Sequence, residues 1–294
     1  MFSGSIVALT TPFTADASAV DYAMLDTMIE RQIAGGTHGI VPCGCTGEAA
    51  TLTTEEQIAV IRHTIKKVAG RAKVIAGTGS NCTAEALSLS KAADEAGADG
   101  VLVITPYYNK PTPEGQYRHY KAVAEAIRIP VMLYNVPGRT GTKILPETVA
   151  RLRKNVKNIA CIKEACGSVD QVCEILEQCD ITVLSGDDGL TLPMMCVGAT
   201  GVVSVVANVV PGDVSAMVNA WHAGDIKTAR ALHYKLLPLV RAMFMETNPI
   251  PVKTALRMIG VGNGVLRMPL CELRPESEKK LAAALTAYGL TVRS

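Results

Sequence analysis

Short apolar runs alternate with segments of helical periodicity along most of this chain, and that alternation limits the fold more than any other feature. The expected strands cover residues 5–9, 39–43, 73–76, 100–104, 130–133, 159–165, 181–184 and 201–206. Because a helical segment follows each expected strand, the strands should pair in parallel. Eight such units predict a closed (β/α)8 TIM barrel, with an open doubly wound sheet as the alternative.

Local signals mark where several helices should begin. Thr53 with Glu56, and Ser168 with Gln171, have the spacing of a capping box, in which side chain and backbone bond reciprocally at a helix start. Thr83 is expected to cap the helix that follows the third strand. These signals support the alternation of strands and helices independently of hydrophobicity.

Beyond Pro211 the pattern is helical only. Helices are expected at about residues 225–244 and 249–259, with a further one near the end of the chain. We therefore predict a catalytic barrel over residues 1–224 and a C-terminal helical region over residues 225–294.

The sixth expected strand, residues 159–165, contains a lysine among apolar and β-branched residues. Strand alternation places Lys163 and Cys161 on one face and Glu164 on the other. Burial in the barrel lumen would disfavour the ammonium form and supply a neutral amine that can attack a carbonyl group. The alternative is a lysine at a strand end that reaches solvent or pairs with a carboxylate.

Polar residues gather where the expected strands end, which is where TIM barrels place their active sites. They are Thr10, Thr11, Cys45, Thr46, Thr78, Tyr107, Tyr108, Tyr134, Asn135, Lys163, Gly186 and Asp187. Tyrosine hydroxyls near an uncharged lysine suit Schiff-base chemistry, although Tyr134 could instead be a core residue with one hydrogen bond. The glycine-rich turn at residues 44–48 could bind a carboxylate through its amides, or be a plain connector.

Composition gives no support to several other classes of function. The net charge is +2, hydrophobic residues make up 48% of the chain, and no charged block suggests a nucleic acid or a membrane partner. The nine cysteines and five histidines show no metal-binding spacing, and no phosphate or dinucleotide loop is present. We expect a cytoplasmic enzyme without metal or cofactor.

Motifs at the strand ends resemble those of one known family. They lie at residues 4–7, 44–48, 76–79, 105–109, 134–140, 162–165, 185–188 and 248–253. In this order they resemble the dihydrodipicolinate synthase family, within the pyruvate-dependent class I aldolases. The resemblance runs from residue 4 to the C-terminal helices. It implies condensation of pyruvate with aspartate semialdehyde in a homotetramer, a dimer of dimers.

The resemblance also assigns roles to residues. Lys163 would form the Schiff base, Tyr134 would pass protons, and Tyr108 would complete a relay from a neighbouring subunit. Thr46 would hold the pyruvate carboxylate and Arg139 the carboxylate of the aldehyde, for which a bidentate guanidinium is well shaped. Backbone groups around Gly186 and Val203 would complete the pocket.

One position departs from the family pattern. The family turn reads Gly-Thr-Thr-Gly-Glu, and its first threonine, a relay member, is Cys45 in this chain. A thiol is a weaker hydrogen-bond donor than a hydroxyl, so this substitution puts the relay in doubt. It is also the only feature that favours a third class of function, a non-catalytic binding barrel.

Two further expectations come from the same resemblance. The alternative enzyme is a sister aldolase or hydratase, such as N-acetylneuraminate lyase or a keto-sugar-acid aldolase, but Arg139 favours the synthase. The positions that match the family's lysine effector site are Ala49, Thr54, Gln57, Asn81, Glu85 and Tyr107. The serine and both histidines of lysine-inhibited members are absent, so weak or absent inhibition by lysine is expected.

Overall fold

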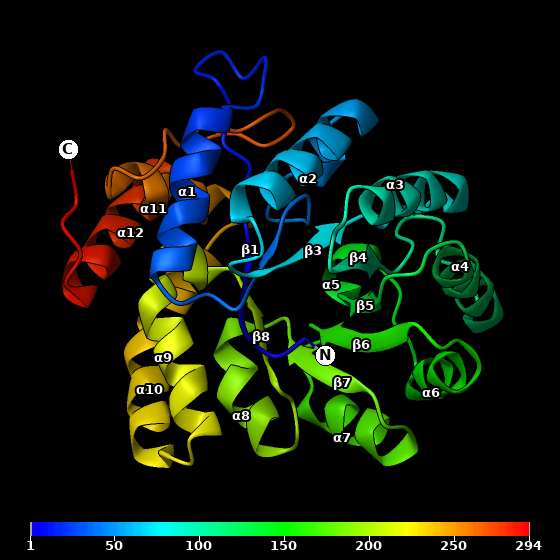
Figure 1. Cartoon of the computed structure of the whole chain (residues 1–294). Coiled ribbons are helices and arrows are strands. Elements are labelled where there is room, and N and C mark those ends of the chain that lie inside the picture. The colour runs from blue at the N-terminus through cyan, green and yellow to red at the C-terminus, as the bar shows by residue number, and fades with distance from the viewer. Residues whose placement is uncertain (1, 294) are drawn as a thin grey trace.

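The computed structural model describes residues 2–293 and has a closed parallel barrel at its centre (Figure 1). Its strands are β1 (Gly4–Ala8), β2 (Gly39–Val41), β3 (Lys73–Gly77), β4 (Gly100–Ile104), β5 (Val131–Asn135), β6 (Ile159–Glu164), β7 (Thr182–Ser185) and β8 (Gly201–Ser204). Each strand pairs in parallel with the next, and β8 closes the barrel on β1. The predicted TIM barrel is confirmed, and the open sheet was the wrong alternative.

Helices surround the barrel and continue beyond it. The outer helices are α1 (Tyr22–Ala34), α2 (Thr54–Val68), α3 (Thr83–Glu95), α4 (Pro113–Glu125), α6 (Pro146–Asn155), α7 (Val169–Gln178), α8 (Thr191–Cys196) and α9 (Pro211–His222). Short turns of helix lie in the loops: α5 (Pro137–Thr140), η1 (Ala49–Thr51), η2 (Asp188–Leu190) and η3 (Val206–Asn208). The C-terminal region contributes α10 (Ile226–Met243), α11 (Ile250–Met258) and α12 (Pro275–Tyr288).

The helix-start signals are confirmed in part. Thr53 caps α2 in a full capping box with Glu56. Ser168 accepts from the Gln171 backbone N–H, but the Gln171 side chain donates to other groups, so only half of that box forms. The prediction for Thr83 was wrong. Thr83 is the first residue of α3, and the position before it, which caps the helix, is Cys82. The Thr83 hydroxyl lies 3.0 Å from His119 Nδ1, so it is not available for capping.

The hydrophobic core has two layers, one inside the barrel and one between the barrel and the helices. The inner layer contains Phe2, Ile6, Ala8, Val41, Ile75, Leu102, Met132, Tyr134, Val136, Cys161, Leu184 and Val203. The Phe2 ring lies against Gly100, the first residue of β4, and so fills the N-terminal end of the barrel. The polar groups of the lumen are left at the opposite end.

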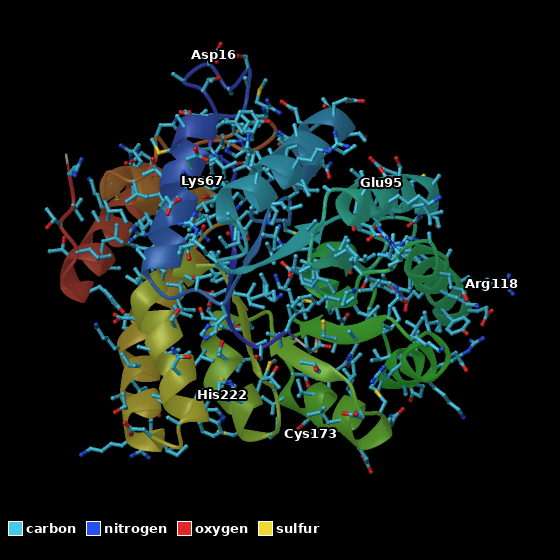
Figure 2. All side chains as sticks on the ribbon, in the orientation of Figure 1. Asp16, Lys67, Glu95, Arg118, Cys173 and His222 are labelled. Carbon is cyan, nitrogen blue, oxygen red and sulfur yellow. The ribbon has the colours of Figure 1, made fainter. Side chains whose placement is uncertain are left out.

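Helices α10 to α12, coloured yellow to red, lie on one side of the barrel, where α10 packs against α9 (Figure 1). The division of the chain near residue 224 stays a prediction. Charged side chains such as Glu95 on α3 and Arg118 on α4 lie toward the outside of the molecule (Figure 2). Within residues 2–293, no helix is long and apolar enough to cross a membrane.

Candidate active site

Lys163 lies in the lumen near the C-terminal end of β6 and is 5% exposed. Tyr134 is its register partner on β5, and the Lys163 Nζ atom is 4.2 Å from the centroid of the Tyr134 ring. On the other side, a methyl group at Gly186 would come within 2.9 Å of Lys163 Cε. A side chain at position 186 would therefore displace the lysine, which explains the glycine.

Burial lowers the pKa of the Lys163 amine to about 8. Arg139 adds to this fall, while Cys45 and the carboxylate of Asp188 oppose it. The amine is therefore available in its neutral, nucleophilic form at a pH where an ordinary lysine is almost wholly protonated.

Glu164, the next residue on the strand, faces away from the lumen as predicted. Its carboxylate accepts two hydrogen bonds from Asn135 Nδ2, at 2.9 and 3.0 Å, and one from the Cys166 backbone N–H at 2.9 Å. Burial raises the pKa of this carboxyl group, although these hydrogen bonds oppose the rise. The acid beside the lysine in sequence is thus separated from it by the strand itself.

A second buried carboxylate, Asp188, belongs to the motif at residues 185–188, but only Asp187 was expected among the polar residues of the site. Asp188 accepts from Ser204 Oγ at 2.5 Å and from the Val205 and Val206 backbone N–H groups at 2.9 and 3.1 Å. Asp187 instead caps η2 through the Gly189 backbone N–H. The paired aspartates were visible in the sequence, but nothing local showed which one is buried.

The turn at residues 44–48 carries Cys45 and Thr46 to the rim of the lumen. Thr11 fixes this turn by donating its hydroxyl proton to the Gly47 carbonyl at 2.7 Å. The Cys45 thiol lies close enough to the Tyr134 hydroxyl to influence its pKa. Burial, together with Cys45, holds the pKa of the Tyr134 hydroxyl well above its usual range. Tyr134 therefore stays protonated, and its hydroxyl can both donate and accept a hydrogen bond.

A cavity of about 380 Å³ opens beside these residues and is lined by Cys45, Tyr134 and Arg139. Arg139 lies on α5, exposed at the rim, and its Nη2 donates to the Asn248 carbonyl at 2.8 Å. Lys163 is not itself a lining residue and contacts this cavity through the Tyr134 ring. Thr46, Gly186 and Val203 are also outside the lining, and of these Thr46 and Val203 are buried.

The same cavity extends to four of the predicted effector positions, Ala49, Gln57, Glu85 and Tyr107. Thr54 and Asn81 are not among its lining residues. The Gln57 amide donates to the carbonyls of Ala49 and Leu52, at 3.1 and 3.5 Å. Glu85 accepts a 2.5 Å hydrogen bond from Ser80.

Tyr108 is the one predicted catalytic side chain that the single chain leaves outside the site. It is 89% exposed, and its backbone has a φ of +69°, a left-handed conformation that bulky residues rarely adopt. An aromatic side chain held outward in this way cannot complete a relay within its own chain.

Sequence reasoning also missed the contribution of the C-terminal region to the turn. Asn248 Nδ2 donates to the Thr46 hydroxyl at 3.0 Å, and Lys253 forms a buried 2.5 Å ion pair with Glu48. The segment 248–253 had been noted only as part of the family pattern. Among residues 2–293 there is no group of three or more His, Cys, Asp or Glu side chains that could hold a metal ion.

Comparison with known proteins gives a consistent result over the whole chain. A model of the dihydrodipicolinate synthetase family matches residues 1–288. The 4-hydroxy-tetrahydrodipicolinate synthase of Geobacter sulfurreducens is 55% identical over 292 residues, covering 99% of this chain and 100% of the relative.

Solved structures agree with this match. Dihydrodipicolinate synthase from Aquifex aeolicus has a TM-score of 0.97 and 48% identity, with 100% of each chain covered. The chloride-inhibited enzyme from Acinetobacter baumannii, solved in complex with pyruvate, has a TM-score of 0.96 and 43% identity, covering 99% of this chain and 100% of that one.

Proposed function

Because the chain belongs to the dihydrodipicolinate synthetase family, we propose that the lumen around Lys163 is its active site and that Lys163 is the Schiff-base residue. The activity is that of a 4-hydroxy-tetrahydrodipicolinate synthase, an aldolase-type lyase of the diaminopimelate and lysine pathway. The named relatives support this reading over a sister aldolase such as N-acetylneuraminate lyase.

The proposed reaction begins when the neutral Lys163 amine attacks the ketone carbon of pyruvate. Loss of water gives the imine, and loss of a methyl proton then gives an enamine, which attacks the aldehyde carbon of L-aspartate 4-semialdehyde. The amino group of the second substrate closes the ring at the imine carbon and releases Lys163. One water molecule is lost overall, and no oxidant or reductant is needed.

The other side chains move protons and hold the two carboxylates. Tyr134, Cys45 and Tyr108 form the proposed relay, with Tyr108 supplied by a neighbouring subunit. Thr46 and the amides of its turn bind the pyruvate carboxylate, and Arg139 at the rim binds the carboxylate of the aldehyde. Backbone groups around Gly186 and Val203 line the site next to the lysine.

The observation that carries this proposal is the burial of Lys163 against Tyr134, with an amine pKa of about 8. Incubation with pyruvate and borohydride should leave one stable adduct per chain, and peptide mapping should place it on Lys163. Lys253 is an internal control, because it is buried to a similar degree but paired with Glu48. An adduct on Lys253, or none in the folded protein, would overturn the assignment.

The proposal extends to assembly and location. From the resemblance to the family we infer a homotetramer, a dimer of dimers. The outward-facing Tyr108, with its positive φ, suits a contact between subunits but does not by itself fix their number. Sedimentation velocity tests the assembly. A cytoplasmic location is supported by the nine cysteines, all of which are free thiols.

A further inference from the structure

Asn248 links the two carboxylate-binding residues of the proposed site from a segment more than a hundred residues away in sequence. It lies just before α11 and is 5% exposed. Its side-chain Nδ2 donates to Thr46 Oγ1 at 3.0 Å, whereas its main-chain carbonyl accepts from Arg139 Nη2 at 2.8 Å. The two contacts use different parts of the same residue.

The direction of the first hydrogen bond determines what the Thr46 hydroxyl can do. A hydroxyl group has one proton to donate and can accept at its lone pairs. Because the Asn248 amide occupies Thr46 as an acceptor, the Thr46 proton remains free for another acceptor. A bound carboxylate is the strongest acceptor expected at this position, and hydrogen bonds to charged groups are stronger than those between neutral groups.

A second observation concerns the oxygen of the same amide, which is an acceptor and so could take a donor on a ligand or a water molecule, but not the carboxylate itself. Asn248 Oδ1 is buried and has no hydrogen-bond partner among the described residues. A buried polar atom without a partner destabilises the folded state, and native proteins keep few of them. Asn248 also lines the cavity that contains Arg139 and Tyr134. A residue kept only for packing would have no need of an amide here.

We propose that Asn248 is a positioning residue for pyruvate, whose amide holds the Thr46 hydroxyl so that its proton faces the substrate carboxylate. This inference rests on the proposed function, and it adds the C-terminal region to the pyruvate site. The main-chain contact with Arg139 is independent of the side chain at position 248. Substitutions there should therefore affect the binding of pyruvate much more than that of the aldehyde.

The test measures the KM of each substrate, together with the pyruvate concentration that half-saturates borohydride trapping. Asn248→Ala should raise the pyruvate KM about tenfold, as expected for one lost hydrogen bond. Asn248→Asp keeps the shape of the side chain but accepts the Thr46 proton and adds a negative charge, so its effect should be larger, on the order of 30-fold. The KM for aspartate semialdehyde should change less than about twofold in both variants.

A double substitution separates positioning from a general structural role. In a Thr46→Val background, Asn248→Ala should have no further effect on pyruvate binding, because Asn248 acts through the Thr46 hydroxyl. Thr254→Ala is the matched control: it also removes one buried hydrogen bond from this region, to the Ile250 carbonyl at 2.9 Å, without contacting the turn. It should leave both KM values unchanged.

The inference is overturned if both Asn248 variants bind pyruvate normally, if their effect persists in the Thr46→Val background, or if it falls on the aldehyde alone. Should Asn248→Ala fail to fold, the nearly isosteric Asn248→Asp provides the same comparison. Trapping in the unmodified protein tests the proposed function separately. If it succeeds while the Asn248 variants behave normally, only the role of Asn248 is wrong.

Discussion

Lys163, the proposed nucleophile, depends on its burial to be uncharged under mild conditions. With a pKa of about 8, half of its amine is neutral at that pH. An ordinary lysine with a pKa near 10.5 would be roughly 0.3% neutral at the same pH. The environment therefore raises the concentration of the reactive form by about two orders of magnitude without any neighbouring base.

The pH dependence of imine formation follows from the direction of this shift. Because the pKa is lowered, the neutral amine should appear at lower pH than in free lysine. The initial rate of pyruvate trapping should rise about tenfold per pH unit below the pKa and level off above about 8. Rapid-quench trapping between pH 6 and 10 measures this, and a rate that continues to rise through pH 10 would contradict it.

Cys45 occupies the middle of the proposed relay, where a group must donate and accept at once. Sulfur does both weakly, and a weakened relay step commonly lowers turnover on the order of 10²-fold. Cys45→Thr should therefore raise kcat with little change in pyruvate binding, which depends on Lys163. The alternative is that Cys45 only packs and that water carries the proton.

Steady-state kinetics of Cys45→Thr beside the parent protein distinguish the two. Cys161→Val is a suitable control, because Cys161 also lies in the lumen but two residues before the lysine and outside the relay. Equal turnover numbers in the parent and in Cys45→Thr would remove Cys45 from the mechanism.

At the scale of elements, α11 and the turn at residues 44–48 are held together by a buried ion pair. Lys253 Nζ is 2.5 Å from Glu48 Oε1, and Glu48 Oε2 accepts from the Arg267 backbone N–H at 3.1 Å. Glu48 also has a left-handed backbone, with a φ of +54°. Neither charge reaches water, so removal of one leaves the other without a counter-charge.

Lys253→Met should therefore lower the free energy of unfolding by about 3–5 kcal/mol. The double variant Glu48→Gln/Lys253→Met should lose less than the single one, because no uncompensated charge remains. Lys121→Met is the control: it breaks an exposed pair with Glu125 and should cost less than about 1 kcal/mol. Urea titration gives all three values, and equal losses for Lys253→Met and Lys121→Met would refute the argument.

The effector positions give a prediction about regulation. Three of them, Ala49, Thr54 and Gln57, lack the groups found in lysine-inhibited members, and Gln57 is already bonded to backbone carbonyls. Each lost contact with a charged ligand typically costs about 1.5–3 kcal/mol. L-Lysine should therefore inhibit weakly or not at all.

Initial rates with increasing lysine test this expectation, and an inhibition constant below a millimolar would contradict it. The triple variant Ala49→Ser/Thr54→His/Gln57→His restores the missing side chains. It should bind lysine more tightly than the parent if these three positions account for the difference.

Local features of the sequence predicted the elements, while contacts between distant residues were not predictable. The β4 bounds agree fully with the expected residues 100–104, because glycine precedes a run with a clear apolar pattern. Two-residue alternation correctly separated Lys163 from Glu164. By contrast, Asn248 and Thr46 are 202 positions apart, and no local pattern relates them. The failure at Thr83 has the same origin, since His119 on another helix takes its hydroxyl.

At the scale of the whole molecule, the role proposed for Tyr108 would link assembly to catalysis. The proposed relay needs a third group besides the Tyr134 hydroxyl and the Cys45 thiol, yet the Tyr108 side chain is 89% exposed on its own chain. If a partner subunit supplies Tyr108, a chain that lacks the lysine and a chain that lacks the tyrosine should together recover activity in a mixed dimer.

Lys163→Met and Tyr108→Phe should each lose most activity when expressed alone, the latter on the order of 10²-fold. Coexpressed as a mixed dimer, the Tyr108→Phe chain keeps its lysine and receives Tyr108 from its partner. About a quarter of all sites should then be intact in a random mixture. No recovery in a mixed dimer confirmed by mass spectrometry would place Tyr108 in its own chain's site or outside the mechanism.

The opposite orientation of Lys163 and Glu164 on β6 has a consequence for how this gene can vary. A shift of the strand by one residue would turn the Glu164 carboxylate into the lumen and the Lys163 amine to the outer face of the strand. On that face Asn135 and Gln171 now donate hydrogen bonds to the carboxylate. A point substitution nearby leaves Lys163 and Glu164 on their present faces of β6, whereas a single inserted or deleted codon within the strand exchanges the two faces. Insertions and deletions between residues 159 and 164 should therefore be far rarer among functional variants than substitutions in the same codons.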